Sequence, residues 1–229
     1  MNLFYVDSDY VQNGHFVLTD QEAQHASKVL RLREGSKIYA TDGKGNMYDG
    51  IIESLSKREV YVEIIRERSI PKGKELVLAM GILKKRTRLE FAVEKAVELG
   101  ASKIVLFQSQ HSERGQFKAG RLQMIIMSAM KQSMRAWLPV LEVYHSLEDT
   151  VDAYNDFYKV IAHEKADISE HADLDIEQSK YLLLIGPEGG FSDREVKYTL
   201  NEGGKMVSLG SYRLRAETAV ITLMSKFVG

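Results

Sequence analysis

The segment Gly186-Pro187-Glu188-Gly189-Gly190 has the residue types of a loop that binds a ligand through its main chain. It follows the apolar run 181–185, which is typical of a central strand covered on both faces, and Ser192 and Glu195 have the spacing of a capping box that starts a helix. Glycine permits positive φ and close approach of a ligand, and ligands of parallel sheets bind beyond the carboxyl ends of strands. By themselves, these residues fit a ligand-binding loop and a sharp strand-to-helix turn without a ligand about equally well.

Several familiar chemistries are excluded by what the sequence lacks. The loop does not have the Gly-Lys-Ser/Thr ending of a P-loop, and neither the Gly-x-Gly-x-x-Gly dinucleotide fingerprint nor a Gly-x-Ser-x-Gly nucleophile elbow occurs in the chain. Cysteine is absent, and the six histidines show no zinc-ligand spacing. We therefore expect no metal site, and ATP, GTP and NAD are poor candidates for the ligand.

A second segment, residues 206–219, carries two arginines in a short loop. A strand is predicted to end at Leu209-Gly210, and a helix of small and apolar residues follows. Arg215 and Glu217 stand two positions apart at the carboxyl end of this strand. They could form an ordinary ion pair that caps the helix, or Glu217 could hold Arg215 as an arginine of a functional site.

Taken together, the two segments resemble the signature of the RsmE family, SPOUT-class enzymes that methylate N3 of a uridine in the 16S ribosomal RNA of the small subunit. The matching motifs are Gly-Pro-Glu-Gly-Gly-Phe-Ser-x-x-Glu, then Ser-Leu-Gly, then Leu-Arg-x-Glu-Thr-Ala. Further stretches that resemble the family lie at 25–35, 94–100, 112–114 and 132–139. The chain departs from many members at Ala26, where they have a second histidine, at Ala216, where they have threonine, and in lacking an early arginine. These departures affect the expected RNA contacts more than the cofactor site.

The resemblance implies an α/β fold class in which a C-terminal α/β trefoil-knot (SPOUT) methyltransferase domain is preceded by a small PUA-like β-barrel domain. The RNA-binding barrel is expected at residues 1–70 and the knotted domain at 74–229. The resemblance also implies a homodimer and S-adenosyl-L-methionine as the cofactor. Carried over by position, the residues expected to bind this cofactor are Ile185, Gly186, Pro187, Glu188, Gly189, Gly190, Ser208, Leu209, Gly210, Leu214, Thr218 and Ala219.

For the chemistry, we hypothesise that Arg215 faces the uracil oxygens and stabilises the negative charge that develops when the N3 proton leaves, and that Glu217 orients it. Glu188 is an alternative candidate, as the proton acceptor. Arginines of both domains are expected to bind RNA phosphates, although each could equally be an ordinary solvated surface residue. They are Arg31, Arg33, Arg114, Arg121 and Arg135.

The elements that must position these residues follow two different rhythms. Short β-branched and aromatic runs predict strands at 3–6, 16–18, 37–41, 47–54 and 59–66. Among them, a capping box at Thr19–Glu22 and an apolar stripe of Ala23, Ala26, Val29 and Leu30 predict a helix. After a linker at 69–74, strands at 76–80, 103–107, 138–144, 158–162 and 181–185 alternate with helices at 88–100 and 120–136. This alternation predicts a parallel sheet.

Composition and charge narrow the class of protein only weakly. The 229 residues carry a net charge of −1, and the basic residues gather between Lys57 and Arg135. No window has the roughly 18–20 apolar residues that cross a bilayer, so we expect a cytoplasmic protein without a membrane partner. Two alternatives remain open: another knotted RNA methyltransferase that acts on the ribose 2′-OH of transfer or ribosomal RNA, and a non-catalytic RNA-binding module of ribosome assembly.

Overall fold

Two six-stranded sheets organise the chain, each within its own unit. The structure is a computed structural model that describes residues 2–112, 116–164, 166 and 174–228. Unit 1 comprises Met1–Lys72 together with Met130–Leu138, and unit 2 comprises Gly73–Ala129 together with Pro139–Gly229. The linker predicted from Pro71 and Gly73 falls at the boundary between the two units.

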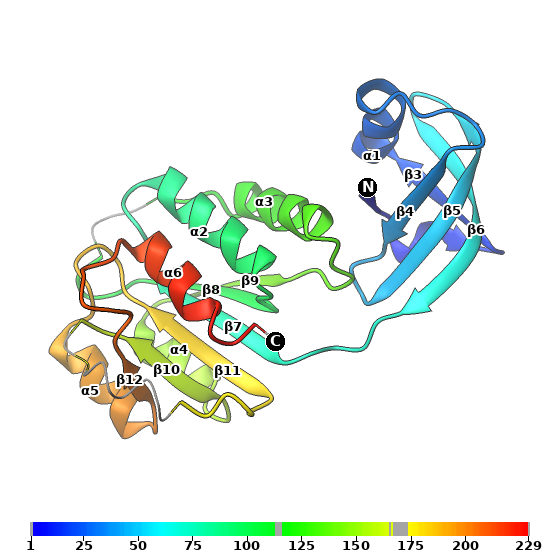
Figure 1. The fold of residues 1–229 in the computed structure, drawn as a ribbon. Helices are drawn as coiled ribbons and strands as arrows, with labels where there is room; N and C mark the ends of the chain where they lie inside the picture. Colours follow the sequence, from blue (N-terminus) through cyan, green and yellow to red (C-terminus); the bar gives the residue numbers. More distant parts are fainter. Residues whose placement is uncertain (1, 113–115, 165, 167–173, 229) are drawn as a thin grey trace. The chain divides into compact units, whose positions relative to one another are not determined.

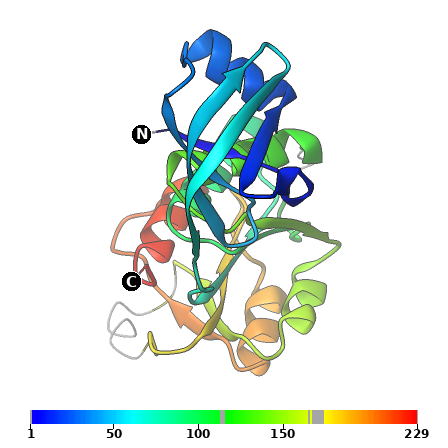
Figure 2. The ribbon, with the colours of Figure 1, turned by 90° about the vertical axis from the view of Figure 1, so that its right-hand side faces the viewer.

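Unit 1 is a curved sheet around an apolar core (Figures 1 and 2). Its strand order is β1-β4-β5-β6-β3-β2, in which β1 pairs with β4 in parallel and the other neighbours are antiparallel. The core contains Phe4, Phe16, Tyr48 and Val62, all at most 3% exposed. The elements are β1 (Leu3–Tyr5), η1 (Ser8–Tyr10), β2 (Val11–Gln12), β3 (His15–Thr19), α1 (Asp20–Gln24), η2 (His25–Val29), β4 (Lys37–Thr41), β5 (Asn46–Leu55) and β6 (Glu59–Ser69). The predicted strands are thus confirmed to within a few residues.

The helix predicted after β3 forms, but two details of that prediction were wrong. Thr19 makes no side-chain capping bond, and the Glu22 carboxylate pairs with Lys131 and accepts from the main-chain N–H of Tyr5 at 3.4 Å instead of closing a capping box. The expected apolar stripe also breaks. The helix continues as the π-helical turn η2, which shifts the periodicity and leaves Val29 69% exposed.

A segment distant in sequence completes unit 1. Residues 130–138 follow most of helix α3 (Ala119–Gln132). The Ala136 carbonyl accepts a hydrogen bond from Thr41 Oγ1 at 3.1 Å, and Trp137 Nε1 donates to the Ile70 carbonyl at 2.9 Å. A Cβ at Gly45 would lie 2.4 Å from the Trp137 ring, so only glycine fits beneath that side chain.

Unit 2 is a parallel sheet with helices on both faces (Figure 1). Its strand order is β12-β10-β11-β7-β8-β9, and every pairing is parallel, as the alternation of strands and helices predicted. The helices α2 and α6 pack together on one face, and α4 and α5 cover the other. The elements are β7 (Glu75–Gly81), α2 (Arg86–Glu98), β8 (Lys103–Phe107), α3, β9 (Val140–Tyr144), α4 (Leu147–Ala153), β10 (Tyr158–Ala162), β11 (Lys180–Ile185), α5 (Asp193–Asn201), β12 (Lys205–Val207) and α6 (Ala216–Met224).

The central strands of unit 2 are buried on both faces, as their unbroken apolar sequences require. Leu182, Leu183 and Leu184 of β11 and Val77 of β7 are all 0% exposed. Among the helices of the described part of the chain, none combines the length and apolar character that spanning a membrane would require.

Candidate active site

A cavity of about 740 Å³ lies beyond the carboxyl ends of three neighbouring strands of unit 2. The strands β10, β11 and β12 end at Ala162, Ile185 and Val207, and the loops that follow them form its walls. The start of α6 and one side chain of α2 complete the lining. The cavity occupies the edge at which parallel sheets bind their ligands.

The loop after β11 turns sharply and passes directly into α5. The Gly190 N–H donates to the Pro187 carbonyl at 2.9 Å, and Gly190 adopts φ +71°, which favours glycine. The capping box predicted at the start of α5 is confirmed: the Ser192 N–H donates to Glu195 Oε2 at 2.8 Å, and the Glu195 N–H donates to Ser192 Oγ at 3.3 Å. The other oxygen of Glu195 accepts from the Gln110 N–H at 3.1 Å, so this buried carboxylate also ties down the loop after β8.

The close approach of Gly81 to Pro187 provides a test of how this loop is supported. A Cβ at Gly81, the last residue of β7, would lie 2.6 Å from Pro187 Cδ and 2.8 Å from Pro187 N. We expect Gly81→Ala to displace the loop, to lower the free energy of unfolding by about 1–3 kcal/mol, and to weaken cofactor binding in calorimetry. Gly120→Ala is the matched control, because no atom lies within 4 Å of the added Cβ. Unchanged stability and affinity in Gly81→Ala would contradict the expected crowding.

The loop after β12 carries the predicted Ser208-Leu209-Gly210 motif along the cavity wall. Ser208 Oγ accepts from the Gly210 N–H at 3.4 Å and donates to the Gly210 carbonyl at 3.2 Å, which stabilises the turn. Within the described residues, the main-chain N–H groups of Leu209 and Leu214 have no hydrogen-bond acceptor. These two cavity-lining donors are therefore available to a ligand.

Arg88 of α2 is the centre of the polar side of the cavity. Its Nε donates to both oxygens of Glu217 at 2.9 Å, its Nη2 donates to Glu217 Oε2 at 2.7 Å, and its Nη1 donates to Glu188 Oε1 at 3.2 Å. Glu188 Oε2 also accepts from the Lys84 N–H at 3.3 Å. One guanidinium thus connects the loop after β11 with the first turn of α6.

The Arg88–Glu217 pair has a clear electrostatic signature. Burial alone would raise the pKa of Glu217, but the hydrogen bonds from Arg88 and from the main-chain N–H of Glu217 itself outweigh it, and the pKa is lowered overall. The side-chain hydrogen bonds with Glu217 in turn raise the pKa of Arg88. At neutral pH, therefore, both groups are charged and the pair is intact.

The structure brings together nearly all the residues expected to bind a cofactor. All of them line the cavity except Thr218, which is exposed on α6. Arg215 also lines the cavity and is exposed, but its guanidinium makes no hydrogen bond to any described residue. The side-chain hydrogen bonds of the Glu217 carboxylate go to Arg88, while the charge of Arg215 also helps to lower the pKa of Glu217. Arg88 was not among the residues expected at the site, although a cation in the first turn of a helix opposes the helix dipole and could have indicated a special role.

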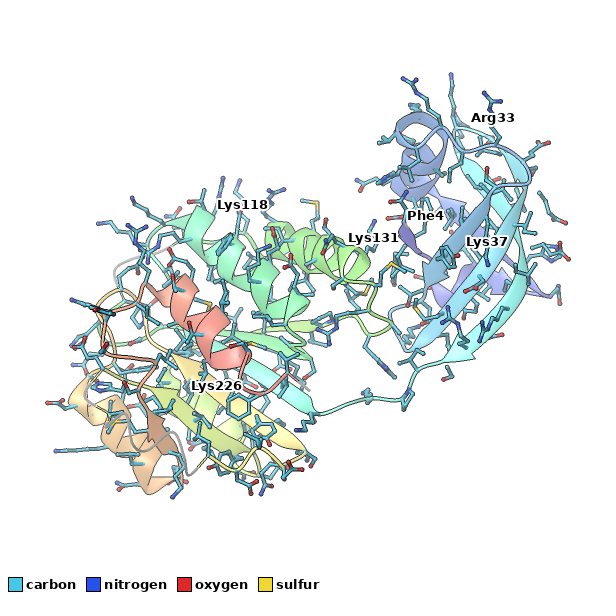
Figure 3. All side chains as sticks on the ribbon, in the orientation of Figure 1. Phe4, Arg33, Lys37, Lys118, Lys131 and Lys226 are labelled. Atoms are coloured by element: carbon cyan, nitrogen blue, oxygen red, sulfur yellow. The ribbon has the colours of Figure 1, made fainter. Side chains whose placement is uncertain are left out.

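The arginines expected to bind RNA fall on both units. Arg31 and Arg33 are exposed in unit 1, and Arg33 extends away from the sheet (Figure 3). Arg121 is exposed in unit 2, 3.6 Å from Glu90 Oε1. Arg135, in unit 1, is half-buried, and this burial lowers its pKa. Arg114 lies outside the described residues. Among described side chains, no group of His, Asp or Glu could hold a metal ion.

Comparison with known proteins identifies the two units. Residues 71–228 match a family model described as an RNA methyltransferase domain, and residues 18–65 match one described as an RNA methyltransferase PUA domain. The chain belongs to the RsmE family of RNA methyltransferases. The resemblance inferred from the motifs is confirmed, as is the fold class of a PUA-like domain followed by a SPOUT-class α/β domain.

Relatives of this family match the chain over almost its full length. A solved structure of a probable rRNA-methyltransferase from Porphyromonas gingivalis is 34% identical, with a TM-score of 0.86 and coverage of 100% of this chain and 98% of that one. The ribosomal RNA small subunit methyltransferase E of Neisseria gonorrhoeae, solved bound to S-adenosyl methionine, is 26% identical with a TM-score of 0.86 and coverage of 99% and 96%. The protein of that name from Mesomycoplasma hyopneumoniae is 29% identical and covers 95% of each chain.

Proposed function

We propose that this protein transfers a methyl group from S-adenosyl-L-methionine to N3 of a uridine in the 16S ribosomal RNA of the small subunit. The observation that carries the proposal is the cavity beyond β10, β11 and β12, because two of its three wall loops, those after β11 and β12, bear the family motifs. The likeness to small-subunit rRNA methyltransferases, one of them solved with S-adenosyl methionine, supports the cofactor and the substrate class.

The residues of the cavity fit this cofactor. Adenine and the amino-acid end of the molecule need hydrogen-bond partners, and the main-chain N–H groups of Leu209 and Leu214 are available for them. The glycines of the loop after β11 let a ligand lie against the backbone, while Ile185 and Ala219 offer apolar surface. The cofactor supplies a methyl group that is already activated as part of a sulfonium, so the chain has mainly to position the base and to manage its N3 proton.

Arg215 is the residue that we assign to the developing charge of the uracil. When N3 loses its proton, negative charge spreads to the neighbouring carbonyl oxygens, and a cation at the cavity wall stabilises it. Glu217 is engaged by Arg88, so it acts by fixing the start of α6 rather than by contact with Arg215. Glu188 is our candidate proton acceptor, since each of its oxygens accepts only one of the hydrogen bonds in this cluster.

We further propose that the protein works as a homodimer in the cytoplasm. The dimer follows from the family resemblance, and unit 2 has apolar side chains that a second copy could cover. Phe91 of α2 and Val228 after α6 are 42% and 52% exposed. The cytoplasm is where ribosomal subunits are assembled and where their RNA is accessible to such an enzyme.

The decisive experiment uses small ribosomal subunits from cells that lack this protein. The subunits are incubated with the protein and labelled S-adenosylmethionine, and the RNA is digested to nucleosides for mass spectrometry. We expect the label in 3-methyluridine. Label in a ribose-methylated nucleoside would instead assign the protein to the 2′-O-methyltransferases. Absence of label from both free RNA and subunits, together with no cofactor binding in calorimetry, would overturn the proposed function.

A further inference from the structure

Tyr212 is an aromatic side chain left in solvent at the wall of the cavity. It lies in the loop between β12 and α6 and is 85% exposed, more than any other large apolar or aromatic side chain among the described residues. None of the described residues packs a ring against it, and none forms a hydrogen bond with its hydroxyl. A large apolar surface held out of the core is informative when it borders a functional cavity.

The loop that carries Tyr212 is short and held at both ends. Before it, the Ser208 hydroxyl bonds to both the N–H and the carbonyl of Gly210. After it, α6 begins at Ala216, and the Ala219 N–H donates to the Arg215 carbonyl at 2.8 Å. Tyr212 therefore projects from a loop whose two ends are held beside the cavity.

Two of the three side chains that follow Tyr212 are cationic, namely Arg213 and Arg215, with Leu214 between them. Arg213 is exposed and lies 3.9 Å from Glu164, and exposed Arg215 lines the cavity. An aromatic ring next to cations in water is the combination that binds single-stranded nucleic acid, because the ring stacks on a base while the cations attract the phosphates.

We propose that Tyr212 positions the RNA by stacking on a nucleobase at the mouth of the cavity. A base that enters this cavity must leave its own stack, at a cost of roughly a few kcal/mol. A ring at the entrance replaces part of the stacking that the RNA loses, so Tyr212 stabilises the open arrangement of the strand. This inference rests on the proposed function in one respect only, namely that the ligand of the cavity mouth is RNA.

The test measures binding rather than turnover, so that it does not depend on the proposed reaction. Small subunits from cells lacking the protein are titrated with wild-type protein, Tyr212→Ala, Tyr212→Phe and Tyr212→Trp in a filter-binding assay without cofactor. We expect Tyr212→Ala to bind roughly 10-fold more weakly, and the two aromatic variants to bind within about twofold of wild type. Leu200→Ala is the control, because it removes another exposed apolar side chain, 40% exposed, at the far end of α5.

Four results would overturn the inference. Equal affinity of Tyr212→Ala and wild type for small subunits would show that the aromatic ring does not contribute to RNA binding. Equal losses in the alanine and phenylalanine variants would assign the effect to the hydroxyl. Weaker affinity of Tyr212→Ala for S-adenosylmethionine would make the ring a cofactor contact, and a change of oligomeric state in sedimentation would make it a subunit contact. If wild type binds subunits but leaves no label in 3-methyluridine, the proposed function fails while the stacking role can still be tested.

Discussion

Arg215→Ala is expected to slow methyl transfer by roughly two to three orders of magnitude while leaving the affinity for S-adenosylmethionine within about twofold of wild type. The guanidinium lines the cavity and makes no hydrogen bond to a described residue, although its charge helps to lower the pKa of Glu217. Its charge is therefore available to the base, where it is needed most when the N3 proton has left. Single-turnover rates with ribosomal subunits and calorimetry with the cofactor separate the two quantities.

Arg213→Ala is the matched control for this experiment. Arg213 is an exposed arginine of the same loop, so its loss removes the same charge from the surface. We expect it to weaken binding of the subunits modestly, with little change in the rate of the bound complex, since a phosphate contact holds the RNA without acting on the base. Near-normal single-turnover rates in Arg215→Ala, or an equal loss in both variants, would contradict the role assigned to Arg215.

The parts of the site that follow directly from one strand end could be predicted from the sequence. The loop after β11 is an example, because the apolar run that precedes it, its glycines and the Ser192–Glu195 capping box are all local signals. The order of the strands follows from general rules only in part. The alternation of strands and helices predicts that the sheet is parallel, but it does not predict that β11 and β12 both pair with β10. That pairing brings the loops after these strands to one cavity.

Contacts between distant residues could not be predicted in the same way. Arg88 and Glu217 are 129 positions apart, and only the packing of α2 against α6 brings them together. Proximity in sequence favoured Arg215 as the partner of Glu217, but the hydrogen bonds of that carboxylate go to Arg88, and Arg215 contributes an attraction of charge. At the π-helical turn η2, a prediction from local sequence was wrong. Regular helical spacing predicted that Val29 is buried, but the irregular turn leaves its side chain exposed.

Arg88 supports the site through its pair with Glu217 and its contact with Glu188. Arg88→Ala is expected to lower methyl transfer at least roughly 100-fold and, unlike Arg215→Ala, to weaken cofactor binding and lower the melting temperature as well. The guanidinium pairs with both Glu188 and Glu217, whose side chains are only 29% and 12% exposed. Without it, two carboxylates face each other at the cavity, and the loop after β11 loses its connection to α6.

Variants of the same cluster separate charge from geometry. Arg88→Lys keeps the positive charge but cannot bind the Glu217 carboxylate through two nitrogens, so we expect an intermediate loss. Arg88→Ala combined with Glu217→Gln removes an unpaired carboxylate and should recover part of the melting temperature without recovering activity. Arg86→Ala is the control, since it removes a neighbouring arginine of α2 whose partner is Glu90 at the helix surface. Full activity in Arg88→Ala would show that the cluster serves folding alone.

Acid titration provides an independent check of the pair. Arg88 holds the pKa of Glu217 below its ordinary value of 4.5. The stabilisation by the pair is therefore complete above that ordinary value and is lost as the pH falls through the lowered pKa. Melting temperatures measured between about pH 3 and pH 7 should fall more steeply on the acid side for wild type than for Arg88→Ala, in which the favourable interaction with the ionised form is missing. Parallel profiles for the two proteins would mean that the charge of Glu217 does not stabilise the fold through Arg88.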